Sequence, residues 1–143
     1  MLLCGLLFPL AVTGFAQVLF PSQANGSIAH WSANNGKAVG SYLIGQKFSS
    51  PIFFHSRNSS LSASGVDPDI TRQDALEQVS RISTATGTTE DALYALIDQN
   101  IEKTFLVFGD SYVNVLRLNL ALIQTYRSVY CPAGTTPVPS YCG

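Results

Sequence analysis

Charged side chains are scarce in this 143-residue sequence, where Asp, Glu, Lys and Arg together make up 12%. An average soluble domain has about a quarter. The low charge and the apolar content exclude a disordered chain. The net charge of −1 provides no long-range field to attract a polyanion, so we expect no nucleic-acid partner. The length fits one folded domain.

Charge is absent altogether from residues 1–36. The first twenty residues, MLLCGLLFPLAVTGFAQVLF, contain only Thr13 and Gln17 as strongly polar side chains. As a helix they would rise about 30 Å, the thickness of a bilayer core. We therefore predict a transmembrane helix over residues 1–20, kinked at Pro9 and ended by Pro21. A linker over 21–36 should follow.

A cleaved signal peptide is the alternative interpretation of the same residues. The run from Leu2 to Val12 has the length of a signal-peptide core, and small residues around Gly14 and Ala16 fit cleavage before Gln17. No basic residue precedes the apolar run, which favours the uncleaved helix. The residues alone do not set the orientation in the membrane, because the first flanking cation is Lys37.

Cysteine is also scarce. Cys131 and Cys142 lie in a Pro- and Gly-rich C-terminal tail, residues 128–143. They either form a disulfide, which would close a loop of about twelve residues worth roughly 3 kcal/mol, or remain free thiols. A disulfide would require an oxidising compartment. Cys4 is expected to be a small packed or lipid-facing residue.

The residues between linker and tail, 37–127, predict a small mixed α+β extracytoplasmic domain. Extended segments are expected over 37–45 and 47–56, and a helix over about 71–85 that starts with a capping box from Thr71 to Asp74. Gly87 should end that helix, and Thr88 or Thr89 should begin another that carries an apolar stripe to Ile101. A strand to about residue 116 and a helix to about 127 complete the domain.

Catalytic and metal-binding motifs are missing. The two histidines, His30 and His55, belong to no zinc motif, and the Gly-Lys pair before Ala38 lacks the hydroxyl residue of a phosphate-binding loop. Asp67 and Asp69 flank Pro68 and fit a turn better than a catalytic carboxylate pair. The residues therefore predict a non-catalytic, membrane-tethered module with no bound metal.

Several longer strings stand in a fixed order along the chain: PLAVTGFAQVLFPSQANGS, GKAVGSYLIGQKF, FFHSR, SASGVDPDIT, LYALID and YVNVLRLNLAL. Together they cover most of residues 8–123. In sequence and in order they resemble the motifs of the C subunit (KdpC) of the Kdp high-affinity potassium-transporting P-type ATPase.

The resemblance implies a single-pass protein of a bacterial or archaeal cell membrane, with its C-terminal domain outside the cytoplasm. Its implied partners are membrane lipid, a potassium-channel-like subunit and a P-type ATPase catalytic subunit. The implied role is that of an accessory subunit that assists assembly and raises the affinity of the catalytic subunit for ATP. ATP and potassium then belong to the complex, and an external domain would influence ATP binding only allosterically.

This chain departs from the family pattern in two ways. The family has a sizeable central stretch after the position of Arg57, whereas residues 58–62 here join the two halves directly. Arg117 stands where the family has glutamate, and Thr84 and Thr86 stand where basic residues are common. A subunit contact that used those charges would be lost or inverted.

The matching motifs suggest residues that contact partners, although a structural role is an equal alternative for each: Asn25, Gly26, Ser27, Gln46, His55, Arg57, Asn114 and Asn119. Gly5 and Gly14 would allow partner helices to approach closely within the membrane. Two other hypotheses remain open. One is an anchored or secreted extracytoplasmic binding module that no longer associates with a pump, and the other is an extracytoplasmic enzyme that uses His55 with a serine.

Overall fold

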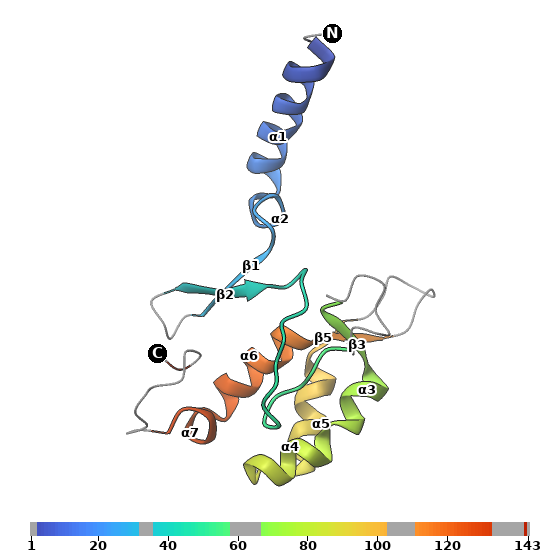
Figure 1. Ribbon diagram of the computed structural model, residues 1–143, viewed down its shortest axis with the longest axis vertical. Helices are drawn as coiled ribbons and strands as arrows, with labels where there is room; N and C mark the ends of the chain where they lie inside the picture. The colour runs from blue at the N-terminus through green and yellow to red at the C-terminus, as the bar shows by residue number, and fades with distance from the viewer. Residues whose placement is uncertain (1–2, 32–35, 58–66, 103–110, 133–141, 143) are drawn as a thin grey trace.

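The computed structural model describes residues 3–31, 36–57, 67–102, 111–132 and 142. An N-terminal helical segment projects from a domain of helices and two small sheets (Figure 1). The predicted mixture of helix and sheet is confirmed.

The N-terminal segment consists of three consecutive helical pieces: the π-helix η1 (Leu3–Leu7), α1 (Phe8–Leu19) and α2 (Pro21–Ala24). The helix changes from π to α geometry beside Pro9, where we predicted a kink, and α1 ends before Pro21 as predicted. Among the described residues, no helix has both the length and the apolar character required to cross a bilayer. The transmembrane helix over residues 1–20 stays a prediction.

An antiparallel ribbon follows, formed by β1 (Ile28–Trp31) and β2 (Lys37–Ser41). The extended segment expected from residue 37 is confirmed as β2. Residues 21–36, which we expect to be a linker, contain both α2 and β1. Residues 47–56 form no strand, so the partner of β2 is β1 and not the segment that follows it.

The second sheet has three antiparallel strands in the order β3-β5-β4: β3 (Asp69–Thr71), β5 (Tyr112–Asn114) and β4 (Ile101–Glu102). The central strand β5 runs directly into helix α6 (Val115–Thr125). The strand-then-helix order predicted for this part of the chain is therefore confirmed, with the change slightly earlier than expected. The residues expected to begin that strand, 105–108, lie outside the described residues.

Three further helices pack against this sheet and α6: α3 (Arg72–Glu77), α4 (Val79–Thr86) and α5 (Glu90–Gln99). The single helix predicted over 71–85 is wrong, because it is broken between α3 and α4 at Gln78. The Gln78 side chain donates to the Asp74 carbonyl at 3.2 Å, while its backbone N–H bonds to Ala75 and Leu76. The side chain thus occupies the acceptor that a continuous helix would use.

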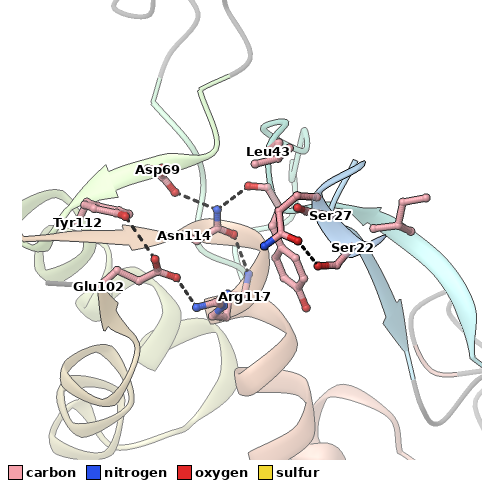
Figure 2. A pocket seen from close by; sticks show the side chains of 11 residues that line it. Ser22, Ser27, Leu43, Asp69, Glu102, Tyr112, Asn114 and Arg117 are labelled. Carbon is pink, nitrogen blue, oxygen red and sulfur yellow. Dashed lines mark hydrogen bonds and ion pairs between the residues drawn. The ribbon is translucent and has the colours of Figure 1, made fainter. Parts of the chain in front are cut away.

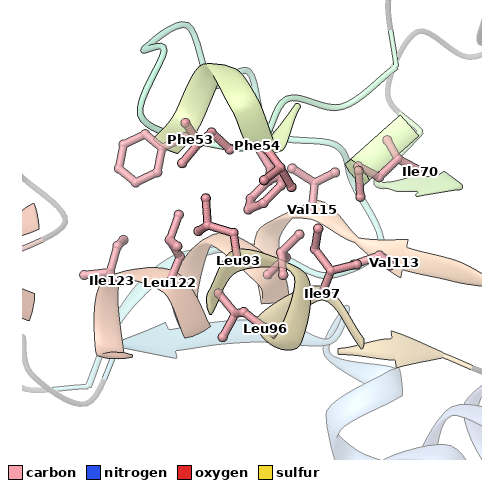
Figure 3. Close-up of a cluster of buried hydrophobic side chains, with 14 of the residues drawn as sticks. Phe53, Phe54, Ile70, Leu93, Leu96, Ile97, Val113, Val115, Leu122 and Ile123 are labelled. Atoms are coloured by element: carbon pink, nitrogen blue, oxygen red, sulfur yellow. The ribbon is translucent and has the colours of Figure 1, made fainter. Parts of the chain in front are cut away.

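The hydrophobic core lies between α6 and the helices α3 to α5 (Figure 3). Its side chains include the predicted stripes of α4 and α5 and the buried residues of β5 and α6. Fully buried members are Val79, Ile82, Leu93, Ile97, Val113, Leu118 and Leu122. Phe54, from the irregular segment after the ribbon, enters the same core with 0% exposure.

The last helix among the described residues is the short α7 (Arg127–Tyr130), which falls partly within the predicted tail 128–143. The structure joins Cys131 and Cys142 in a disulfide, with Cα atoms 5.5 Å apart. Beside it, the buried Tyr130 donates a hydrogen bond from its hydroxyl to the Ile52 carbonyl at 2.7 Å. The disulfide is therefore attached to the edge of the core.

Candidate functional site

A cavity of about 440 Å³ lies where the N-terminal segment meets the folded domain (Figure 2). Its walls come from α2 and the start of β1, from the turn after β2, and from the three-stranded sheet with the first turn of α6. The lining residues are Ser22, Gln23, Ser27, Ile28, Tyr42, Leu43, Asp69, Glu102, Tyr112, Asn114 and Arg117. Segments more than seventy residues apart in sequence thus share one surface.

Asn114 connects these walls. Its side-chain oxygen caps α6 by accepting from the Arg117 backbone N–H at 3.2 Å. Its amide nitrogen donates to the Tyr42 carbonyl at 2.8 Å and to the Asp69 carboxylate at 2.9 Å (Figure 2). With 6% exposure and three partners, Asn114 holds the cavity together. The structural alternative for Asn114, a helix cap, is confirmed, and its role as a partner contact stays a prediction.

Glu102 and Arg117 form an ion pair at the cavity wall. The Tyr112 hydroxyl donates to Glu102 at 3.3 Å, and the Arg117 guanidinium lies 5.3 Å from the centroid of the Tyr42 ring (Figure 2). Arg117 stands where the resembling family has glutamate, and here it faces an acid. The reversed charge therefore has a matched partner within this chain.

Acidic groups dominate the electrostatics of this cavity. Burial raises the pKa of Asp69 above its ordinary value of 3.8, and the charges of Asp67 and Glu102 raise it further against the opposing Asn114 hydrogen bond and Arg117. The nearby charge of Glu102 likewise raises the pKa of Tyr112. Burial is thus the main cause of the shift at Asp69, and the charge of Glu102 is the main cause at Tyr112.

The Asn25-Gly26-Ser27 motif makes the turn from α2 into β1. The Asn25 side chain donates to the Pro21 carbonyl at 2.6 Å, and Gly26 and Ser27 have positive φ angles of 81° and 48°. The Ser27 backbone N–H bonds to the Ser22 carbonyl at 2.7 Å. Of the three, Ser27 reaches the cavity. Asn25 and Gly26 therefore form a turn, the structural role that was the alternative to a partner contact.

His55 and Arg57 line a second, smaller cavity of about 220 Å³ beside α3. Arg57 is exposed and pairs with Asp74 at 3.4 Å. The His55 ring bonds to the Ser50 carbonyl at 2.9 Å, a contact with backbone and not with a serine hydroxyl. Gln46, on the preceding turn, donates to the Ile44 carbonyl at 3.0 Å. The structure thus places His55 and Arg57 together, apart from the Asn114 cavity.

Asn119 lies inside the domain, with 1% exposure. Its amide accepts from the Phe54 N–H and donates to the Phe54 carbonyl, both at 2.9 Å. Gln78 makes the same pair of bonds to His55, at 2.8 and 3.1 Å. The side-chain amides of Asn119 and Gln78 therefore form the backbone hydrogen bonds that a neighbouring strand would otherwise provide to this irregular segment. Asn119 presents no surface to a partner in this structure.

Gly5 and Gly14 lie on the exposed N-terminal helical segment, and no atom lies within 4 Å of a Cβ built at either position. Their role in helix packing stays a prediction. Among the residues that the structure describes, no group of three or more His, Cys, Asp or Glu side chains is arranged to hold a metal ion.

Sequence reasoning missed Tyr42, Glu102 and Tyr112 as members of the cavity. Asp69, predicted to be part of a turn, begins β3, and its backbone N–H bonds to the Asp67 carboxylate at 3.1 Å. Its contact with Asn114 spans 45 residues and has no local signal in the sequence. Ser27 and Asn114 are the predicted site residues that line this cavity.

A sequence model of the family described as "KdpC: K+-transporting ATPase, c chain" matches residues 1–62 and 59–124. The two matches overlap at residues 59–62, within the short segment 58–62 that we expect to join the two halves directly.

Individual relatives agree. The potassium-transporting ATPase KdpC subunit of Gloeobacter violaceus is 36% identical over 165 residues, covering 83% of this chain and 87% of that protein. The Caldanaerobacter subterraneus subsp. tengcongensis subunit is 34% identical over 177 residues, covering 89% and 90%. Staphylococcus aureus KdpC subunit 2 is 34% identical over 171 residues, covering 84% and 90%.

These alignments are longer than the 143 residues of the chain, so the relatives contain residues without a counterpart here. The family name denotes one subunit of a transporting ATPase, in agreement with the prediction that the chain is not itself an enzyme. On the family match over most of its length, this chain belongs to the KdpC family of potassium-transporting ATPase subunits.

Proposed function

We propose that this chain is a non-catalytic accessory subunit of an ATP-driven potassium uptake pump. The proposed partners are a channel-like potassium subunit and a P-type ATPase subunit, whose assembly the chain assists. The observation that carries the proposal is the ordered family match on both sides of the missing central stretch. The Asn114 cavity supports it, since Ser27, Tyr42, Asp69 and Asn114 each come from a different family motif.

The N-terminal segment is proposed as a single membrane pass, with the folded domain outside the cytoplasm. The five π-helical and twelve α-helical residues rise about 26 Å at 1.5 Å per residue, near the thickness of a bilayer core. They contain no charged side chain. Large apolar side chains along them, including Phe8, Leu10, Phe15 and Val18, are more than half exposed in the isolated chain. Lipid and partner helices would cover them.

Arg57 is the proposed contact for a partner in the folded domain. It is exposed and pairs with the equally exposed Asp74, and such surface pairs contribute little to stability. Exchange of Asp74 for a partner carboxylate would therefore cost the domain little. The proposed effect of the subunit on ATP affinity is allosteric, because an external domain does not reach cytoplasmic nucleotide.

The test is co-purification. The chain, tagged at its C-terminus, is expressed with the channel-like and ATPase subunits and isolated from membranes in detergent. We expect a potassium-stimulated ATPase to co-purify, with a lower KM for ATP than the pump isolated without this chain. Recovery of the folded chain without the other subunits would instead favour a binding module that no longer associates with a pump. A mature N-terminus at Gln17 would show that the N-terminal segment is a cleaved signal peptide and would favour a secreted module.

Arg57→Ala tests the proposed contact within the same assay. The variant should retain several-fold less ATPase while its thermal unfolding stays unchanged, because only an exposed ion pair is lost. Arg127→Ala, which removes another exposed arginine, on α7, is the matched control and should retain the pump as the parent does. If both variants retained the same amount of ATPase, Arg57 would not be a partner contact.

A further inference from the structure

Exposed apolar side chains of the folded domain gather at the base of the N-terminal helix. Outside that helix, the large hydrophobic residues exposed in the described part of the chain are Ile28, Leu43, Ile44 and Val129. The first three are 46%, 61% and 50% exposed. Ile28 begins β1, and Leu43 and Ile44 form the turn that leaves β2. The Tyr42 N–H bonds to the Ser27 carbonyl at 3.1 Å, which brings the two places together.

The ribbon presents one face to the domain and the other to the side of the helix. On the inner face, Ala29 is buried opposite Gly40, and a Cβ at Gly40 would lie 3.2 Å from the Leu116 side chain of α6. Ile28 and Ser41, the neighbouring pair, therefore point outward. In Figure 1, α1 and α6 lie on opposite sides of the ribbon, and β2 runs across the direction of α1. The outer face of the ribbon thus faces the side from which α1 projects.

The stretch of sequence that carries Leu43 and Ile44 contains no charged residue. No Asp, Glu, Lys or Arg occurs between residues 38 and 46, whereas Lys37 and Lys47 bracket that stretch in the sequence and are exposed. Exposed lysines that flank an apolar stretch fit a lipid interface, where the side chains of lysine reach the phosphate groups. A protein partner that covered the patch would not require this arrangement of cations.

We propose that Ile28, Leu43 and Ile44 form a second membrane contact, through which the folded domain rests on the leaflet where α1 ends. This inference rests on the proposed membrane pass, because the apolar end of α1 at Leu19 and Phe20, both 58% exposed, connects to the patch through the short helix α2. The two contacts together fix the orientation of the ribbon, and hence the mouth of the Asn114 cavity, close to the lipid surface. Leu43 and Ile28 also line that cavity.

Fluorescence quenching in membranes tests the proposal. The full chain, with Cys4→Ser and its disulfide intact, receives a single cysteine at one of three positions: Leu43→Cys, Leu10→Cys near the middle of the N-terminal helical segment, or Thr84→Cys on the exposed face of α4. Each is labelled with an environment-sensitive fluorophore and placed in vesicles of phosphatidylethanolamine and phosphatidylglycerol, with and without the pump subunits. The vesicles contain a quencher attached at a shallow or a deep position of the lipid chain.

We expect the shallow quencher to quench the label at Leu43 several-fold more than the label at Thr84, and the deep quencher to quench the label at Leu10. Quenching at Leu10 with Leu43 no more quenched than Thr84 would overturn the inference and leave the membrane pass standing. No quenching at Leu10 would overturn the pass itself. A label at Leu43 that is shielded only when pump subunits are present, without lipid quenching, would assign the patch to a protein partner and also overturn the inference. Ile44→Cys serves as a second reporter of the same turn.

Discussion

A few polar side chains hold the irregular segment of this domain in place through hydrogen bonds to its backbone. The segment after the ribbon has no strand partner, yet Asn119 and Gln78 satisfy the backbone of Phe54 and His55 in turn. Arg81 adds a bond to the Phe53 carbonyl at 3.0 Å. Buried backbone groups are costly when unsatisfied, so these side chains replace a missing strand. They also fix the position of His55 and Arg57 beside α3.

Asn119→Leu should therefore lower the free energy of unfolding by about 3 kcal/mol, because it leaves the buried N–H and carbonyl of Phe54 without partners. Urea denaturation of the full chain in mild detergent measures the loss. Gln124→Ala, at an exposed position of the same helix α6, is the control and should change the value little. A loss no greater than that of the control would show that the amide clamp is dispensable.

Asp74 gives a pH dependence whose sign follows from its surroundings. Burial acts to raise the pKa of Asp74, but the hydrogen bonds with Thr71 and the Arg57 guanidinium outweigh it and hold the pKa below its ordinary value of 3.8. The stabilisation is thus complete above pH 3.8 and is lost as pH falls through the lower folded value. Asp69, whose pKa is raised, acts in the opposite sense.

Asp74→Asn should be less stable than the parent at neutral pH by about 1 kcal/mol, the usual loss for a weakened helix cap. The difference should shrink as pH falls below 3.8, since the parent carboxylate then also becomes neutral. Denaturant unfolding as a function of pH measures both curves. Glu77→Gln, on the same helix α3, should not show this convergence, and a difference for Asp74→Asn that is constant with pH would contradict the assignment.

At the scale of the element, helix boundaries follow local rules where the interacting residues are close in sequence. The Thr71–Asp74 capping box and the left-handed Gly87 after α4 are both present as predicted. The break at Gln78 was not predictable in the same way, because the Gln78 side chain is also engaged with the backbone of His55. Local patterns predict where a helix starts and stops, but they do not predict a hydrogen bond to a residue 23 positions away.

Gly87→Ala tests the helix terminus. Gly87 has φ of 72° and its N–H bonds to the Ser83 carbonyl at 2.8 Å, a conformation that a Cβ makes unfavourable. The variant should lose about 1 kcal/mol of stability, seen as a lower Tm, and Gly87→Asn should lose less because asparagine tolerates this conformation. If alanine and asparagine were equally tolerated, the left-handed cap would not be important for stability.

At the scale of the whole molecule, the disulfide and the Asn114 cavity both join distant parts of the chain. The bond between Cys131 and Cys142 spans 11 residues and adjoins Tyr130, which reaches back to Ile52 across 78 residues. The cavity joins the base of the N-terminal segment to the far sheet through Asn114. Together these links attach the C-terminal end and the ribbon to one core.

Reduction of the disulfide should lower the free energy of unfolding by about 3 kcal/mol in the loop-entropy picture. Calorimetry of the full chain with and without reductant measures it. The double variant Cys131→Ser with Cys142→Ser should match the reduced parent and no longer respond to reductant. Cys4→Ser, which removes the free exposed cysteine, should retain the full response, and a parent Tm that is independent of reductant would contradict a stabilising role.

The sequence by itself determined the mixed α+β class, the apolar N-terminal segment, the helix caps and the ordered motifs by which the family is identified. Each depends on side-chain chemistry or on hydrogen bonds within a few residues, which a linear pattern displays. Only the tertiary structure decided that β1 pairs with β2, that Cys131 is bonded, and that Ser27, Asp69 and Asn114 share one cavity. These features arise because burial and long-range hydrogen bonding select which distant segments meet, and no local spacing encodes that choice.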